Sequence, residues 1–309
     1  MITSETVFVL GAGASIPYGF PSGIELREEL CKVGTAGLPI SDTLMVCGIS
    51  NNETGLFASA FRDSRIGSID AFLSRRNEFV DIGKLAIAAV LCARENPRIF
   101  DYSNIEDDWY FALWNAMVAD VHQADDLVLN KIKIITFNYD RSLEYYLFTA
   151  IRNTFGLAEV DTYSILHKIS IKHVYGQLGE FPEHPFQVSN SPSIVEAAAN
   201  GIRIIPEDRE NNDVTIREIR AWLSSARNIC FLGFGFDSLN IHRLELSSII
   251  AEKFQIGRRD QNIYTSGYGK TSSELSMIRN SIYGGLTNWY PVENEKSLMT
   301  LRNNAHLLA

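Results

Sequence analysis

A short apolar run that ends in glycines constrains the fold of this chain more than any other stretch. Val7–Leu10 are four consecutive strand-forming residues, and they lead directly into Gly11-Ala-Gly-Ala-Ser15. An apolar run closed by glycines and followed by a helical pattern is typical of the first strand of a parallel sheet, turning into a helix. Because glycine has no Cβ, the backbone at Gly11 and Gly13 can approach a pyrophosphate closely. An ordinary tight turn without a ligand is the structural alternative.

The glycine pattern departs from that of nicotinamide-dependent dehydrogenases. Their fingerprint requires a third glycine, where this chain has Ile16, and an acidic residue after a second strand about 20 residues further on. The corresponding region, Glu25–Cys31, has a helical pattern instead, and the next strand-like run is Ile132–Phe137. The sequence therefore disfavours a hydride-transfer enzyme.

Charge and composition narrow the class of partner. The chain has 309 residues, 46% of them hydrophobic, which is enough to bury a full core as one domain, with or without a large insert. Its formal net charge is −9, and no local run of Lys and Arg interrupts this acidic balance. Nucleic-acid surfaces require a basic stripe. We therefore expect a protein or a small molecule as partner, and no direct binding of nucleic acid.

Cysteine usage and hydropathy predict a cytoplasmic protein without a metal site. The four cysteines form no CxxC pair, so no structural zinc site is expected, and they are predicted to be reduced core thiols. The longest apolar run, Leu85–Ala93, is too short to span a bilayer. Met1–Thr6 lacks the basic start of a secretory signal.

The long stretch after the first strand has helical periodicity and no good strand. Its clearest helix is Asn77–Arg94, and a second, Ile105–Val121, is expected to start at the capping box Ser103-x-x-Glu106. Gly34–Asn52 is rich in Gly, Thr and Ser and is predicted to be a loop that orders over a ligand. We predict a helical insert or small domain at residues 21–126, with residues 1–20 and 127–309 forming the main sheet domain.

The second half of the chain alternates strand-like runs with helical patterns. This alternation predicts an α/β fold with a doubly wound parallel sheet. The expected strands are Ile132–Phe137, Ser170–Tyr175, the weaker Gly201–Ile205, Asn228–Leu232, Asn262–Thr265 and Leu286–Tyr290. In such a sheet, ligands bind beyond the carboxyl ends of the strands. Four segments are expected to meet there: Gly11–Ser15, Thr136–Asp140, His173–Gly179 and Gly233–Asn240.

Taken together, these segments resemble the sirtuin-type NAD-binding domain, in particular its branch found in bacterial antiphage defence. The resemblance is carried by Phe8–Pro21 (FVLGAGASIPYGFP), Thr136–Asp140 (TFNYD), Phe231–Asn240 (FLGFGFDSLN) and Tyr264–Gly269 (YTSGYG), in family order. It spans nearly the whole chain, and the insert contributes only Ser68–Leu73 (SIDAFL). The resemblance implies a Rossmann-like sheet of sirtuin type that binds NAD.

The resemblance assigns catalytic roles to Asn138 and Asp140, which match a TxNxD motif. The amide of Asn138 would hold the nicotinamide ribose or a water beneath the anomeric carbon, and the carboxylate of Asp140 would accept a hydrogen bond from the nicotinamide carboxamide. Each also has a structural alternative, because Asn is a common turn residue and Asp140 can cap the helix that begins near Arg141.

His173 is the predicted general base. Many relatives have a histidine directly before the glycine of this segment, where this chain has Tyr175, and some defence relatives have a similar His-x-Tyr-Gly segment. His173 lies two residues earlier, on the same face of a strand. An imidazole titrates near neutral pH, which suits activation of water or of a ribose hydroxyl. A buried structural histidine packed beside Tyr175 is the competing interpretation, and His167 is a weaker candidate base.

The same match predicts the residues that contact the dinucleotide. They are Gly11, Ala12, Gly13, Ser15, Thr136, Asn138, Asp140, Tyr175, Gly233, Gly235, Asn240 and Gly267.

The activity that the resemblance implies is hydrolysis of NAD⁺ to ADP-ribose and nicotinamide. Protein deacylases of this fold usually carry a four-cysteine zinc module, which this sequence lacks. The resemblance is greatest to sirtuin-like subunits that pair with a HerA-type ATPase, which implies a homo-oligomer controlled by a protein partner and no membrane. Three alternatives remain open: a non-catalytic module that binds NAD or ADP-ribose, an NAD-dependent deacylase, and a pure assembly scaffold that binds no nucleotide.

Overall fold

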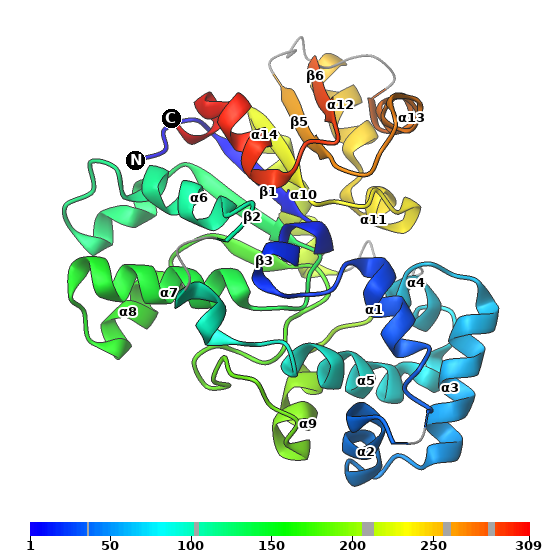
Figure 1. Cartoon of the computed structure of the whole chain (residues 1–309). Coiled ribbons are helices and arrows are strands. Elements are labelled where there is room, and N and C mark those ends of the chain that lie inside the picture. Colours follow the sequence, from blue (N-terminus) through cyan, green and yellow to red (C-terminus); the bar gives the residue numbers. More distant parts are fainter. Residues whose placement is uncertain (36, 102–104, 206–212, 256–260, 284–287) are drawn as a thin grey trace.

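The fold is organised around a six-stranded parallel sheet with the order β3-β2-β1-β4-β5-β6 (Figure 1). The computed structural model describes residues 1–35, 37–101, 105–205, 213–255, 261–283 and 288–309. The strands are β1 (Thr6–Leu10), β2 (Ile132–Thr136), β3 (Ile171–His173), β4 (Asn228–Leu232), β5 (Asn262–Gly267) and β6 (Asn288–Glu293). This order is that of doubly wound sheets: strands are added on one side of β1 up to β3, and the order then reverses, so that β4 to β6 are added on the other side of β1. The predicted Rossmann-like α/β class is confirmed; its sirtuin type remains an expectation.

The two central strands form the core of the sheet. All five residues of β1 and all five of β4 are buried. Continuous burial is expected of parallel strands that have helices on both faces, and it explains why both read as unbroken apolar runs in the sequence. The predicted strand Asn228–Leu232 coincides with β4.

Helices fill the chain between β1 and β2 and alternate with strands afterwards. Before β2 they are α1 (Gly23–Leu30), α2 (Pro39–Val46), α3 (Asn51–Ser64), α4 (Ile69–Leu73), α5 (Val80–Cys92) and α6 (Trp109–Val118). After β2 they are α7 (Ser142–Phe155), α8 (Glu159–Leu166), α9 (Pro192–Gly201), α10 (Val214–Ser225), α11 (Ser238–Leu244), α12 (Leu246–Gln255), α13 (Ser272–Tyr283) and α14 (Ser297–Asn303).

The helices pack in three groups (Figure 1). One side of the sheet carries α6, α7 and α14, and the other carries α10, α12 and α13. The third group, α1 to α5, lies below the carboxyl edge of the sheet in the view of Figure 1, and α9 packs against its central helix α5. The helix α6 belongs to residues 21–126 but packs with the helices on the sheet. The helix α9 lies outside residues 21–126 but packs with the group α1 to α5.

Three local expectations are wrong. The segment Gly34–Asn52, expected as a loop, contains α2, because Pro39 starts a helix well and Leu44 is buried against the core. The expected strand Gly201–Ile205 is not one: α9 extends to Gly201, and Ile202 makes a single antiparallel bridge to Gly176.

The third wrong expectation concerns the start of α6. This helix begins at Trp109, where the carboxylate of Asp108 accepts a hydrogen bond from the amide of Phe111 at 3.1 Å. The predicted capping residue Ser103 lies outside the described residues.

All four cysteines are free thiols. Cys92 and Cys230 are buried in the core, as predicted, whereas Cys31 and Cys47 are only half-buried.

The two ends of the chain lie side by side, and the amide of Thr3 donates to the carbonyl of Ala309 at 3.0 Å (Figure 1). Among the helices of the described residues, none has the length and apolar character needed to cross a bilayer.

Candidate functional site

Strand register brings four of the predicted segments together at the carboxyl edge of the sheet. Leu10, the last residue of β1, pairs with Thr136 of β2 and with Leu232 of β4, and Thr136 pairs with His173 of β3. The loops that follow these residues therefore start side by side. β1 and β4 flank the point where the strand order reverses, which is the position at which open α/β sheets bind ligands.

The two glycine loops at this edge are packed backbone to backbone. The amide of Gly13 donates to the carbonyl of Gly233, and that of Gly11 to the carbonyl of Leu232, both at 3.0 Å. A Cβ on Gly11 would lie 2.6 Å from the carbonyl oxygen of Gly233. Gly233 itself has a φ of +58°, and a Cβ there would lie 2.0 Å from the amide nitrogen of Ala14. The close contact between the two loops therefore explains the glycines at these positions without a bound ligand.

The chain after the first glycine loop differs from the expected helix start. It forms two 3₁₀ turns, η1 (Ala12–Ala14) and η2 (Ile16–Tyr18), and α1 begins only at Gly23. Ala12 and Gly13 remain partly exposed. The indole of Trp109 on α6 donates to the carbonyl of Ala14 at 2.8 Å and so holds the turn η1 in place.

Asn138 ties the β2 loop to the β1 loop. Its side-chain amide donates to the carbonyl of Gly11 and to the hydroxyl of Ser15, both at 3.0 Å. Its own amide donates to the hydroxyl of Thr136 at 3.0 Å. Asn138 retains 8% exposure, so in this conformation its amide faces protein. The sequence prediction that Gly11, Ser15, Thr136 and Asn138 lie together agrees with this geometry.

Asp140 lies two residues before the first residue of α7, and its carboxylate is buried. Its carboxylate accepts hydrogen bonds from the amide of Ser142 at 3.1 Å and from the hydroxyl of Ser142. That hydroxyl also contacts the hydroxyl of Tyr110 at 2.8 Å. Burial raises the pKa of Asp140, and hydrogen bonds from Ser142 and Ser15 counteract this only in part. The N-cap position of α7 is Arg141, without a side-chain cap, so Asp140 braces the turn into the helix through Ser142 and does not cap it in the usual sense.

His173 is held by both ring nitrogens. Nδ1–H donates to the carbonyl of Asn138 at 2.8 Å, and Nε2 lies 2.7 Å from a carboxylate oxygen of Glu144. Burial by itself lowers the pKa of His173, but the charge and hydrogen bond of Glu144 outweigh it, so the net pKa lies above the ordinary value of 6.5. Because both neighbours are acceptors, this geometry fits an imidazolium paired with Glu144.

A second network closes the site from the side of α11. The hydroxyl of Tyr175 donates to the side chain of Asn240 and accepts from the guanidinium of Arg243. Arg243 is buried, lies 4.9 Å from the centre of the Tyr175 ring, and donates to the carbonyl of Ile205 at 2.6 Å. Two predicted nucleotide contacts, Tyr175 and Asn240, are thus bonded to each other.

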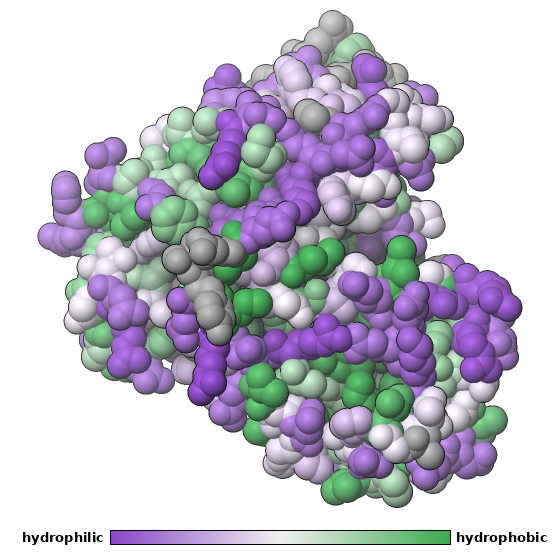
Figure 2. All heavy atoms as spheres, viewed as in Figure 1, coloured by the Kyte–Doolittle hydropathy of each residue, from purple (hydrophilic) through white to green (hydrophobic). Residues whose placement is uncertain are grey.

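The same network reaches the helices between β1 and β2. The hydroxyl of Tyr139, in the β2 loop, donates to the carboxylate of Asp70 on α4. Burial raises the pKa of Asp70 from 3.8 to about 6, although the hydrogen bond from Tyr139 and the charge of Arg243 oppose the shift. Figure 2 shows the surface indented on the right of the view, between these helices and the part that carries α11.

The shifted pKa of Asp70 predicts a pH-dependent stability. The folded protein binds a proton at Asp70 more tightly than the unfolded chain, so its stability should fall as pH rises from about 4 to about 6 and then level off. We expect Asp70→Asn, compared with wild type by urea unfolding at pH 4.5 to 8 (roughly the titration range), to show a flatter profile. Asp63→Asn, at an exposed carboxylate, is the matched control. Parallel profiles for wild type and Asp70→Asn would refute this assignment.

The remaining predicted residues lie around this centre or away from it. The amide of Gly233 donates to Ser266 Oγ at 2.8 Å, next to Gly267 at the end of β5. The carbonyl of Gly235 accepts from Lys270 at 3.3 Å. His167, the weaker candidate base, is exposed at the end of α8 and packs edge-on against Tyr163.

Two cavities in the described part of the chain lie away from this site. One, of about 490 Å³, is lined mainly by charged residues near the end of β6, including Glu106, Glu293 and Lys296. The other, of about 460 Å³, opens near the amino ends of β4 and β5. Neither includes Asn138 or His173. Among the residues that the structure describes, no three His, Cys, Asp or Glu side chains are grouped so that they could hold a metal ion.

Sequence reasoning missed the side chains that hold the candidate site in place. Glu144 is one helical turn after Asp140, a spacing that places both near the start of one helix, and this was the available signal. Asp70 lies in the SIDAFL stretch of the resemblance, without an assigned role. Arg243 and Trp109 carried no signal, because their contacts join residues far apart in the chain.

Comparison with known proteins adds no identification. No family model matches the chain, and no curated protein matches it.

Proposed function

We propose that this chain is an NAD⁺ hydrolase that cleaves NAD⁺ to ADP-ribose and nicotinamide. One observation carries the proposal. At the switch point of the sheet, the Asn138 amide bridges the first glycine loop while the Asn138 carbonyl binds the ring of His173. A polar amide and a titratable imidazole thus stand beside the loop at which this kind of sheet receives a phosphate-containing ligand. The resemblance to sirtuin-like defence subunits supports the same assignment.

The proposed reaction breaks one bond and forms another. The bond between the ribose anomeric carbon and the nicotinamide nitrogen breaks, its electron pair leaves with nicotinamide, and an oxocarbenium-like centre develops. Water adds to that carbon and gives up a proton. With Nδ1–H bound to Asn138, the basic atom of His173 is Nε2, which receives the proton once water replaces Glu144 there. Asn138 orients the water or ribose, and Asp140 binds the nicotinamide carboxamide.

The closed geometry supports control by assembly. Asn138, Asp140 and Tyr175 are buried, and Tyr175 is bonded to Asn240. Binding of NAD⁺ to these residues therefore requires this closed conformation to open. We propose a cytoplasmic antiviral effector that has low activity alone and becomes active in a homo-oligomer with a protein partner; by resemblance, the partner is a HerA-type ATPase.

The direct test is release of nicotinamide from NAD⁺ by the purified chain, with and without the candidate ATPase. We expect release with the partner present, and a loss of at least about 100-fold in Asn138→Ala, because the variant removes the group that orients the attacking water. A melting temperature near that of wild type would show that the variant is folded. Full activity in Asn138→Ala, or no release by wild type in either state, would refute the proposal.

A non-catalytic NAD or ADP-ribose module is the second candidate. The observation that favours it is the engagement of both ring nitrogens of His173, which leaves no free basic atom in this conformation. This candidate predicts saturable binding of ADP-ribose without release of nicotinamide in any assembly state.

A further inference from the structure

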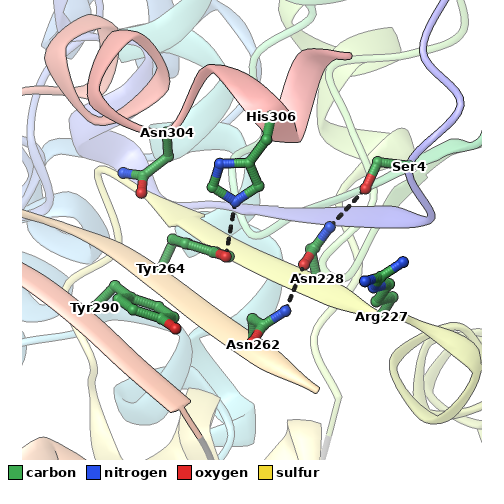
Figure 3. A pocket seen from close by; sticks show the side chains of 8 residues that line it. All are labelled: Ser4, Arg227, Asn228, Asn262, Tyr264, Tyr290, Asn304 and His306. Carbon is green, nitrogen blue, oxygen red and sulfur yellow. Dashed lines mark hydrogen bonds between the residues drawn. The ribbon is translucent and has the colours of Figure 1, made fainter. Parts of the chain in front are cut away.

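A second cavity lies at the end of the sheet opposite the candidate active site. It has a volume of about 460 Å³ and opens between the amino ends of β4 and β5 and the carboxyl-terminal segment formed by α14 and η7 (Ala305–Leu308) (Figure 3). This volume is within the range of small-molecule sites, about 300–1,000 Å³. None of its lining residues takes part in the proposed hydrolysis.

The amide side chains of Asn228 and Asn262 form one wall of this cavity, and Asn288 continues their hydrogen-bonded ladder outside it. Asn228 donates to Ser4 Oγ at 2.7 Å, Asn262 donates to Asn228 at 3.1 Å, and Asn288 donates to Asn262 at 2.9 Å. The three asparagines are the first residues of β4, β5 and β6 and are paired in register. Because each amide is fixed by its neighbour, this wall is a preorganised polar surface (Figure 3).

Two tyrosines supply an aromatic wall. Tyr264 and Tyr290 are register partners on β5 and β6, and their rings are parallel, with centres 4.9 Å apart. The hydroxyl of Tyr264 is fixed by His306 Nε2 at 2.8 Å. Tyr290 keeps 45% exposure, which leaves aromatic surface open to a ligand. Figure 3 shows both hydroxyls pointing the same way, toward the end of the sheet that carries Arg227.

Arg227 gives the cavity its charge. Its side chain is exposed, lines the cavity, and has no hydrogen-bond or ion-pair partner among the residues that the structure describes. No carboxylate is among the lining residues. In a chain with a net charge of −9, this is a local site that favours an anion.

We propose that this cavity is a second, independent binding site for a nucleoside monophosphate. The guanidinium of Arg227 binds the phosphate, since arginine matches phosphate oxygens in a two-pronged geometry. The base packs on the exposed surface of Tyr290, because aromatic side chains stack with bases. The fixed amide ladder offers hydrogen bonds to the polar rim of the nucleotide. A bare phosphate would leave the aromatic wall unused, and an uncharged nucleoside would leave Arg227 unused.

The test is calorimetric titration of the full chain with AMP, GMP, CMP and UMP, with adenosine and inorganic phosphate as separate arms. We expect saturable binding of at least one monophosphate, and binding at least about tenfold weaker for phosphate alone and for the nucleoside. Arg227→Ala should weaken the nucleotide at least about tenfold, with Arg227→Lys in between. Tyr290→Ala should weaken it as well.

Arg217→Ala is the matched control, because it removes an exposed arginine on α10 that does not line the cavity. Its affinity should equal that of wild type. Absence of binding by all four nucleotides up to about 10 mM, unchanged affinity in Arg227→Ala, or equally tight binding of phosphate alone would each overturn the proposal. The hydrolase proposal is unaffected by any of these results, because the two sites share no residue.

Discussion

Replacing His173 by alanine is expected to lower nicotinamide release by the activated assembly about 10²–10⁴-fold, the usual contribution of a positioned general base. The reason is geometric: Nδ1–H is fixed on the carbonyl of Asn138, so Nε2 is the one ring atom that can accept the proton from water. The measurement is the initial rate of nicotinamide release at saturating NAD⁺. Binding of NAD⁺ should be much less affected than the rate.

The matched control is His167→Ala, which removes an exposed histidine at the end of α8 and should leave the rate unchanged. Equal losses in the two variants, or full activity in His173→Ala, would show that His173 is not the base.

The neighbour of His173 adds a pH readout to the same prediction. In the free enzyme Glu144 helps to raise the pKa of His173 above 6.5, so kcat/KM should fall on the acid side with an apparent pKa above that value. In Glu144→Gln the negative charge that raises the pKa of His173 most is lost, so this limb of kcat/KM should move to lower pH. An unchanged acid limb would show that Glu144 does not position or tune the imidazole.

The largest loss of stability is expected from breaking the buried ion pair next to the site. Arg141 forms two parallel hydrogen bonds with Glu95, at 2.6 and 3.0 Å, and both side chains are only 2% exposed. Arg141 also donates to the carbonyl of His184 at 2.6 Å. We expect Arg141→Met to lower the free energy of unfolding by about 3–5 kcal/mol, because Glu95, whose pKa burial already raises to about 7, must then stay buried as an unpaired carboxylate or take up a proton. Urea unfolding at roughly neutral pH measures this loss.

Two further variants separate burial of charge from simple loss of a contact. The double variant Arg141→Met/Glu95→Leu should be more stable than Arg141→Met alone, because no buried charge remains. Glu78→Gln, which breaks the exposed pair with Arg76, should have little effect on stability, because solvent screens that pair. If Arg141→Met costs no more than this exposed variant, the pair is not desolvated as the structure indicates.

The sheet was largely predictable because buried parallel strands carry an unambiguous signal. β1 and β4 are five-residue runs buried on both faces, so nearly every residue in them is apolar. Gly201–Ile205 carried a weaker apolar signal and is not a strand, since a short apolar run does not reveal whether a neighbouring strand is available to pair with it.

The candidate site was predictable in part. Asn138, Asp140 and His173 follow or end strands that register places side by side, so their proximity follows from the strand pattern together with the topology. What their polar atoms bind was not predictable. The pairing of His173 with Glu144, and that of Tyr175 with Asn240 and Arg243, depend on side-chain directions that no spacing in the sequence reveals.

The sequence by itself determined the class of fold, the strands at its centre and the loops at their carboxyl ends, because apolar runs and glycines act locally on the backbone. Only the tertiary structure decided that the two glycine loops pack against each other, that Tyr175 is bonded to Asn240 and Arg243 of α11, and that a separate cavity lies at the opposite end of the sheet. These features arise from contacts between segments far apart in the chain, such as Gly13 with Gly233. Such contacts form only when the whole chain is folded.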